Sequence, residues 1–236
     1  MTDKEQEVVA SFLRKLGLKA KDPEIFFEAL THTSYANEQK QAGRRDVESN
    51  ERLEFLGDAV VDLLVCDILY RRYPNASEGE MSRVKAAVAS EKVLSMIARE
   101  MELGKVLFLG RGEEMTGGRD RDSILADAVE AVLGAVYIEG GLELVKRIFQ
   151  NRFEGYVDLV MRGKLLFDYK TALQEITQRE FKSLPQYRLV SKDSEGFTVE
   201  VLVNGRPMGK GKGRSKKEAE KAAAKEAYRI LTEETE

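Results

Sequence analysis

The stretch that decides the fold of this chain is Asn50-Glu51-Arg52-Leu53-Glu54-Phe55-Leu56-Gly57-Asp58, which an apolar run continues to Tyr70. Its length and composition predict a long helix. Glu54 and Asp58 are four residues apart and therefore share one helix face. From Leu53 to Tyr70 there is no lysine, arginine or histidine. Burying an unpaired carboxylate is costly, so something outside this helix must compensate these charges.

A second stretch has the same character: Ser123-Ile124-Leu125-Ala126-Asp127-Ala128-Val129-Glu130-Ala131-Val132-Leu133-Gly134. Asp127 and Glu130 are three residues apart, so they also share a helix face. Gly57 and Gly134 stand beside the two acidic pairs, although a helical glycine costs roughly 1 kcal/mol relative to alanine. We expect these glycines to let the two helices approach closely, which would bring the acidic pairs together.

Four acids on two such helices predict a divalent metal ion and metal-assisted chemistry. The chain has one histidine and one cysteine, which excludes a zinc site built on several of these ligands. The remaining ligands are oxygens, which suit Mg²⁺, with Mn²⁺ as a substitute. The alternative is a pair of amphipathic helices, each with a narrow, solvated acidic face.

Several residues near these stretches have simpler interpretations. His32 lies at an apparent helix end and is expected to be a structural hydrogen-bonding residue. Because it is the one histidine, a Ser-His-Asp triad is excluded unless His32 itself serves in it. Cys66 has apolar neighbours and is expected to be a small core residue. Asp62 continues the first acidic face, whereas Asp67 points elsewhere and can reach solvent. Both aspartates are expected to be bystanders.

Residues 1–161 are predicted to form an all-α domain. Pro23 opens a helix that follows the first one, and residues 37–49 are polar and loop-like. Gly104 to Arg121 is glycine-rich but lacks the Gly-Lys-Ser/Thr ending of a P-loop, so we expect a mobile loop. The last helix of this domain is expected over Leu142–Met161.

The pattern changes at the predicted linker, residues 162–167. The second predicted domain, 168–235, is small and has the order α-β-β-β-α, so the fold class is α+β overall. Asn204-Gly205 predicts a hairpin turn, and Ser215 predicts the start of the last helix.

Charge is uneven along the chain, whose net charge is −3. Residues 164–236 contain 15 Lys and Arg against 12 Asp and Glu. Six of these cations lie within twelve residues, which is typical of a phosphate-binding patch, although a solvated helix start is the alternative. They are Lys210, Lys212, Arg214, Lys216, Lys217 and Lys221. No segment has the roughly 18 apolar residues that a membrane helix needs, and the charged N-terminal residues do not resemble a secretory signal. The expected compartment is the cytoplasm.

The stretch 50–58 resembles the signature of ribonuclease III, the double-stranded-RNA endonuclease, and Asp127–Ala131 resembles the second acidic motif of that family. The tail, with Gly211–Ala219 and Ala222–Ala224, resembles a double-stranded-RNA-binding domain. The resemblance covers essentially the whole chain, in the order of a bacterial ribonuclease III.

The resemblance implies a role for each matching residue. Glu54, Asp58, Asp127 and Glu130 match the metal-binding acids, of which Asp58 and Glu130 are the catalytic pair. Glu51 matches an acid at the edge of the site. Phe55 matches an aromatic residue that packs into a partner subunit, which implies a homodimer. The residues that match RNA contacts are Thr171, Gln174, Glu175, Ser215, Lys216, Lys217 and Lys221.

The implied function is Mg²⁺-dependent hydrolysis of double-stranded RNA. The products would have 5′-phosphate and 3′-hydroxyl ends with short 3′ overhangs, and the role would be processing of rRNA and other RNAs. The chain departs from the family in its short connection Asp193-Ser194-Glu195-Gly196, which lacks the longer, histidine-containing loop that enters a minor groove. Two alternatives are a double-stranded-RNA-binding protein that does not cleave and a structural helical protein with a basic tail.

Overall fold

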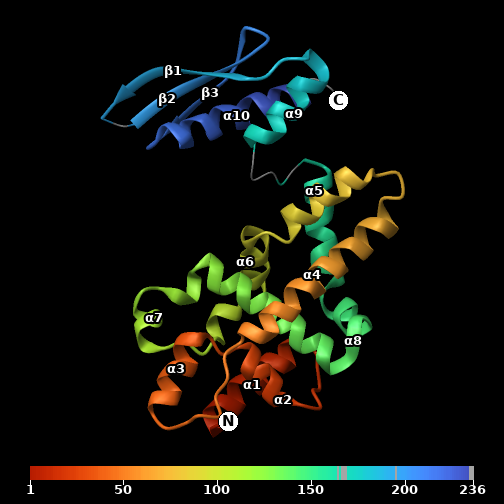
Figure 1. Cartoon of the computed structure of the whole chain (residues 1–236), viewed down its shortest axis with the longest axis vertical. Helices are drawn as coiled ribbons and strands as arrows, with labels where there is room; N and C mark the ends of the chain where they lie inside the picture. Colours follow the sequence, from red (N-terminus) through yellow and green to blue (C-terminus); the bar gives the residue numbers. More distant parts are fainter. Residues whose placement is uncertain (164, 166–168, 195, 234–236) are drawn as a thin grey trace. The chain divides into compact units, whose positions relative to one another are not determined.

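The computed structural model describes residues 1–163, 165, 169–194 and 196–233. The chain divides into two compact units, Met1–Leu165 and Leu166–Glu236 (Figure 1). The described residues of the first unit form helices and one isolated bridge, between Thr31 and Phe108. The second unit has the order α-β-β-β-α. The predicted fold class is therefore confirmed, while residues 164, 166 and 167 of the predicted linker lie outside the described residues.

The first unit is built on two long helices, α4 and α8, which pack against each other more extensively than any other pair of elements in the described chain. Its elements are α1 (Asp3–Lys15), α2 (Pro23–Ala29), α3 (Thr33–Gln41), α4 (Glu51–Arg72), α5 (Glu78–Val88), α6 (Glu91–Glu100), η1 (Leu103–Lys105), α7 (Arg111–Met115), η2 (Gly118–Asp120) and α8 (Asp122–Met161). The backbone of α8 breaks at Gly140 and Gly141, just before the start predicted for the last helix. Both long helices bury apolar side chains in one core.

The prediction of a loop over residues 37–49 is wrong at its start, because α3 extends to Gln41. His32 is the N-cap of this helix: its ring nitrogen Nδ1 accepts a hydrogen bond from the backbone N–H of Ser34, 3.2 Å away. The structural role expected for His32 is thus confirmed, but at the beginning of a helix and not at its end. Histidine is not among the common N-cap residues, and only Ala36 is buried in α3, so the sequence gives a weak helix signal here.

The prediction of a mobile loop from Gly104 to Arg121 is also wrong for much of that segment, which contains η1, α7 and η2. Arg119 holds it together. Its guanidinium donates to the backbone oxygens of Gly104 and Leu107, at 2.7 and 2.9 Å, and forms two hydrogen bonds with the Glu114 carboxylate. These bonds satisfy backbone carbonyls that glycine-rich segments usually leave to solvent.

Two residues of α4, Cys66 and Asp67, have surroundings that differ from those predicted. Cys66 is exposed and is not a core residue, because α8 covers only one side of this apolar helix. Asp67 forms ion pairs with Arg71 at 2.9 Å and Lys146 at 2.8 Å, so it does not simply reach into solvent. Large apolar side chains are also exposed on α4: Phe55 is 84% exposed and Tyr70 is 77% exposed.

The second unit packs α10 (Lys216–Glu233) and α9 (Tyr169–Phe181) with an antiparallel sheet in the order β1-β2-β3. The strands are β1 (Gln186–Asp193), β2 (Gly196–Val203) and β3 (Arg206–Gly213). Valines of β2 and alanines of α10 form its core. Asn204 and Gly205 both have positive φ, as a two-residue hairpin turn requires, which confirms that prediction. Asp193 pairs with Gly196, while Glu195 lies outside the described residues.

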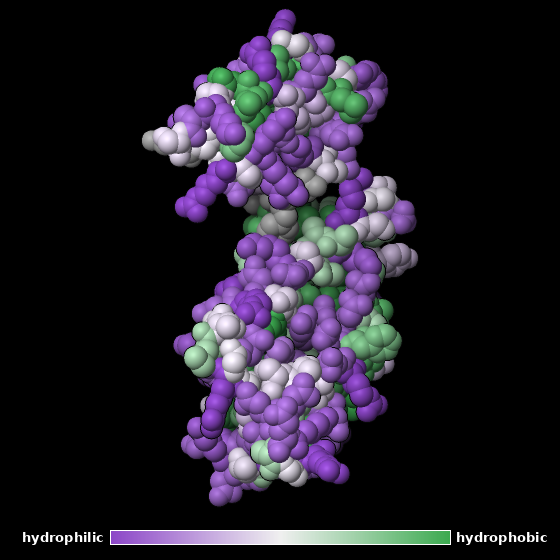
Figure 2. Space-filling view, turned by 60° about the vertical axis from the view of Figure 1, so that its left-hand side comes forward, coloured by the Kyte–Doolittle hydropathy of each residue, from purple (hydrophilic) through white to green (hydrophobic). Residues whose placement is uncertain are grey.

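The surface in Figure 2 is mostly hydrophilic, with hydrophobic residues gathered in separate patches. Within the described parts of the chain, no helix has both the length and the apolar character needed to cross a bilayer.

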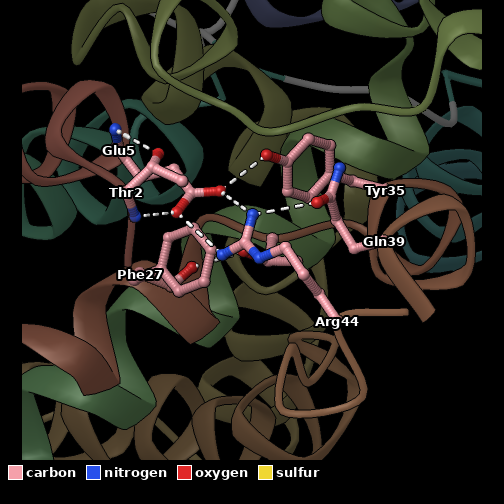
Figure 3. Close-up of polar contacts among 7 residues, drawn as sticks. Thr2, Glu5, Phe27, Tyr35, Gln39 and Arg44 are labelled. Carbon is pink, nitrogen blue, oxygen red and sulfur yellow. Dashed lines mark hydrogen bonds and ion pairs between the residues drawn. The ribbon is translucent and has the colours of Figure 1, made fainter. Parts of the chain in front are cut away.

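A buried ion pair joins the first helix to the segment that leads into α4 (Figure 3). The Glu5 side chain is only 4% exposed, and its two oxygens accept from the two Nη atoms of Arg44 at 2.7 and 3.0 Å. Tyr35 donates to the same carboxylate at 2.7 Å. Burial alone would raise the pKa of Glu5, but the bonds from Arg44, Thr2 and Tyr35 lower it to about 2. The carboxylate is therefore charged and fully bonded.

We predict that Arg44→Met destabilises the first unit by about 3–5 kcal/mol, because it leaves the Glu5 carboxylate buried without its cation. The free energy of unfolding in urea measures this. Arg71→Met is the matched control: Arg71 is 70% exposed in its pair with Asp67, so its loss should change the free energy of unfolding far less. Equal losses for the two variants would contradict the prediction.

Candidate metal centre and RNA-binding surface

The two acidic stretches meet where α4 and α8 cross. A Cβ atom built on Gly57 would overlap the backbone carbonyl of Glu130, and one on Gly134 would overlap the carbonyl oxygen of Leu53. Both glycines thus lie where the two helix backbones touch, as the sequence predicts. A side chain at either position would force the helices apart.

Three of the four predicted acids converge at this crossing. Glu54 of α4 and Asp127 and Glu130 of α8 each place a carboxylate oxygen within 4.8 Å of the others. All three side chains are half-buried. Burial raises the pKa of all three. For Glu130, burial and then the charges of Asp58, Asp127, Glu54 and Asp62 raise the pKa to about 8.

The fourth of these acids, Asp58, and the predicted edge residue, Glu51, lie at the margin of this group. Asp58 is exposed and is not among the three oxygens that converge, although its charge contributes to the raised pKa of Glu54 and of Glu130. Glu51 is exposed and accepts a hydrogen bond from Ser49 at 2.7 Å. Its charge also raises the pKa of Glu54. The structure therefore gathers three acids tightly and places Asp58 and Glu51 beside them.

Backbone bonds fix the start of α4 next to His32. The N–H of Asn50 donates to the carbonyl of Thr31 at 2.9 Å, and the N–H of His32 donates to the carbonyl of Phe108 at 3.1 Å. His32 lies close enough to Asp127 to oppose the upward shift in the pKa of that carboxyl. The effect is smaller than that of burial, so it leaves the acidic group without full compensation.

The group of three acids fits a divalent cation. The charges that act on Glu130 are all negative, and its oxygens lie beside those of two other carboxylates. A hard cation would relieve this repulsion, because carboxylate oxygens are the ligands preferred by Mg²⁺ and Mn²⁺.

We predict that Mg²⁺ raises the melting temperature more at pH about 8 than at pH about 6. The pKa of Glu130 is raised from 4.5 to about 8 in the folded protein. Without metal, the folded state keeps a proton that the unfolded state releases, so stability falls as the pH rises through this window. Metal binding requires the carboxylate form and displaces the proton.

Thermal unfolding in EDTA and in Mg²⁺, at both pH values, measures this difference. Glu130→Gln removes the carboxyl whose pKa is raised to about 8 and should reduce the pH dependence of the Mg²⁺ effect. An identical Mg²⁺ effect at both pH values in the wild type would contradict the prediction.

In the second unit, the residues predicted to contact RNA are at the surface. Thr171, Gln174 and Glu175 are exposed on α9, and Lys216, Lys217 and Lys221 are exposed on α10. Ser215 accepts a hydrogen bond from the N–H of Glu218 at 3.2 Å, so it caps the start of α10 as predicted. The cations thus surround a helix N-terminus, whose free N–H groups favour phosphate.

The described chain also has a cavity of about 310 Å³ in the first unit, lined in part by Glu28, Arg44 and Glu48. None of the predicted site residues lines it. This cavity is therefore not part of the acidic site.

Known proteins share both units of this chain. Residues 22–155 match a family model described as ribonuclease-III-like, and residues 169–231 match the double-stranded RNA binding motif. Ribonuclease 3 of Pseudothermotoga lettingae is 53% identical over 98% of this chain and 99% of its own length. Ribonuclease 3 of Pelotomaculum thermopropionicum is 44% identical over 94% of this chain and 92% of its own length. The nuclease domain of ribonuclease III from Campylobacter jejuni is 36% identical, with a TM-score of 0.55, over 62% of this chain and 95% of that structure.

A helical unit with an acidic site, followed by a unit of the double-stranded-RNA-binding type, defines an endoribonuclease. The chain belongs to the ribonuclease III family.

Proposed function

We propose that this endoribonuclease is a Mg²⁺-dependent homodimer that hydrolyses double-stranded RNA. The products have 5′-phosphate and 3′-hydroxyl ends with short 3′ overhangs, and its role is the processing of rRNA and other RNAs. The observation that carries this proposal is the convergence of Glu54, Asp127 and Glu130 in a chain with a double-stranded RNA binding motif. A cytoplasmic location stays a prediction from the sequence.

In this proposal, Glu54, Asp58, Asp127 and Glu130 hold the metal, and Glu51 borders the site. A divalent ion in such a site activates water and neutralises phosphate charge. Asp58 and Glu130 are the catalytic pair, and the exposure of Asp58 suits a ligand on the side from which the RNA arrives. Half-burial of the other three acids limits their motion and keeps their oxygens in position.

The second unit supplies recognition of the duplex. A-form RNA hides its base edges in a deep, narrow major groove, so a protein recognises it by shape and by contacts with phosphates and 2′-hydroxyls. The exposed residues of α9 would reach a minor groove. Lys217 and Lys221, one helical turn apart, would hold the phosphates of the intervening major groove. The tight β1–β2 connection offers little reach for another minor-groove contact.

The direct test is to incubate the full chain with a long RNA duplex, with and without Mg²⁺. Metal-dependent cleavage to short duplexes with 5′-phosphate ends supports the proposal. Duplex binding without cleavage in Mg²⁺ or Mn²⁺ would instead indicate a double-stranded-RNA-binding protein.

The homodimer is supported by an apolar stripe on α4. Phe55, Leu63 and Tyr70 are 84%, 48% and 77% exposed, and their spacing places them on one side of the helix. The acidic face of the same helix borders this stripe. The nuclease domain of ribonuclease III from Campylobacter jejuni is described as structurally flexible in a region involved in dimer formation.

We predict that Phe55→Asp converts the dimer to a monomer. Burying a phenylalanine contributes about 2–3 kcal/mol per copy, so its loss from both subunits should raise the dimer dissociation constant at least about 100-fold. Sedimentation analysis measures the change in mass. Met115→Asp is the matched control, because Met115 is 88% exposed on α7. A dimer that survives Phe55→Asp would show that this stripe is not the interface.

A further inference from the structure

A lysine from α5 lies at one end of the acidic face of α4. The Lys85 ammonium donates to Oδ2 of Asp62 at 2.5 Å. Asp62 follows Asp58 by one turn, so it continues the row of acids that begins with Glu54. Because α4 has no cation between Leu53 and Tyr70, the positive charge at this end comes from a different helix, 23 residues further along the chain.

This lysine belongs to the electrostatic surroundings of the acidic site. The charge of Asp62 acts on Glu130, and the charge of Asp58 acts on Lys85. The ammonium therefore lies near Asp62 and Asp58, and it partly neutralises the Asp62 end of the row.

Packing alone explains this ion pair poorly. The Lys85 and Asp62 side chains are 31% and 39% exposed, and ion pairs that water reaches contribute little to stability. Asp62 accepts one of the three hydrogens of the ammonium, and the remaining donors are open to a further acceptor. The hydrogen bonds at the two ends of α5, from the Glu80 N–H to Ser77 and from Ser90 to the Ala87 carbonyl, do not involve this ion pair.

The substrate supplies a reason for a cation at this end. A strand whose scissile phosphate lies at Glu54, Asp127 and Glu130, and which follows the acidic face of α4, would bring its next phosphates to Asp58 and Asp62. Two carboxylates there, Asp58 and Asp62, would repel those phosphates. A lysine held beside them would attract a phosphate as a point charge.

We propose that Lys85 binds a backbone phosphate adjacent to the one that is hydrolysed, and that Asp62 positions its ammonium. This inference rests on the proposed function. Lys85 would thus be an RNA-contacting residue of the nuclease unit, and Asp62 would be a positioning residue and not a bystander.

The test compares Lys85→Met, Lys85→Arg and Asp62→Asn in the full chain, with a long RNA duplex and Mg²⁺. Lys85→Met should raise KM roughly tenfold, the effect of losing one charge-assisted hydrogen bond, while kcat changes little. It should also lower the slope of log Kd against log salt by about 1. Lys85→Arg keeps the charge and should restore KM to near the wild-type value. Asp62→Asn keeps the lysine and should leave the salt slope unchanged.

Lys15→Met is the matched control, because Lys15 forms a comparable exposed ion pair with Glu102 at 2.8 Å. Its KM and salt slope should equal those of the wild type. If Lys85→Met and Asp62→Asn lower the melting temperature equally and leave both KM and the salt slope unchanged, the pair is structural and the inference is overturned. Failure of the wild type to cleave would overturn the proposed function instead, and the salt slope of duplex binding would still decide the role of Lys85.

Discussion

Replacing Glu130 by glutamine is expected to lower the rate of duplex-RNA cleavage by roughly 10³-fold or more, while duplex binding is largely kept. Glutamine has the same shape but neither the charge nor the second carboxylate oxygen. A divalent metal ion held here would stabilise the charge of the transition state by several kcal/mol. Losing one of its ligands should therefore have a large effect on the rate. Burial and then the neighbouring carboxylates raise the pKa of Glu130 to about 8, so a cation at this point would act on a carboxylate that the protein leaves uncompensated.

Single-turnover cleavage with saturating enzyme measures this rate, and a filter-binding assay in the same buffer measures the dissociation constant of the duplex. The matched control is Glu143→Gln, at an exposed position of α8 beyond the break in that helix. It should cleave like the wild type. A Glu130→Gln protein that cleaves within tenfold of the wild type would exclude Glu130 as a metal ligand. If Glu130→Gln loses duplex binding as well as cleavage, then duplex binding is not supplied by the second unit alone, as proposed.

The centre of the site could be predicted from the sequence because its signals are local. Spacings of three and four residues place carboxylates on one helix face, and the absence of nearby cations leaves them uncompensated. Gly57 and Gly134 then predict the close approach that the structure has. Each of these signals can be read from the sequence of a single helix.

The features that could not be predicted depend on contacts between distant segments. Lys85 meets Asp62 across 23 residues, and Arg44 meets Glu5 across 39 residues. No local sequence pattern predicts either ion pair. The same is true of Arg119, which organises a glycine-rich segment by bonding its carbonyls.

Cys66 shows why burial is difficult to predict on a helix whose apolar residues extend beyond one face. The apolar neighbours of Cys66 predict burial, but α8 covers only part of α4, and Phe55, Cys66 and Tyr70 remain exposed. The exposed face is explained if a second copy of the chain covers it. The departure from the expected burial thus supports the proposed dimer.

Gly57→Ala is expected to destabilise the first unit by about 2–3 kcal/mol, although alanine is the better helix former. The added Cβ would overlap the backbone carbonyl of Glu130. A backbone atom cannot rotate away as a side chain can, so α4 and α8 must separate. That movement displaces Glu130 relative to Glu54, and misplacement of a reacting group by about 1 Å can lower a rate by roughly 10²-fold. Unfolding in urea measures the stability, and single-turnover cleavage below the transition measures the rate.

Gly155→Ala separates the effect of the helix crossing from the general effect of adding a methyl group to a helix. Gly155 is exposed on α8, and no atom lies within 4 Å of the Cβ it would gain. This variant should be more stable than the wild type by about 0.5–1 kcal/mol and should cleave normally. A loss of stability in Gly57→Ala together with a gain in Gly155→Ala would show that glycine is required at the crossing of α4 and α8. If Gly57→Ala were as stable and as active as the wild type, the two helices could separate without cost, and the close approach would not be what brings the acids together.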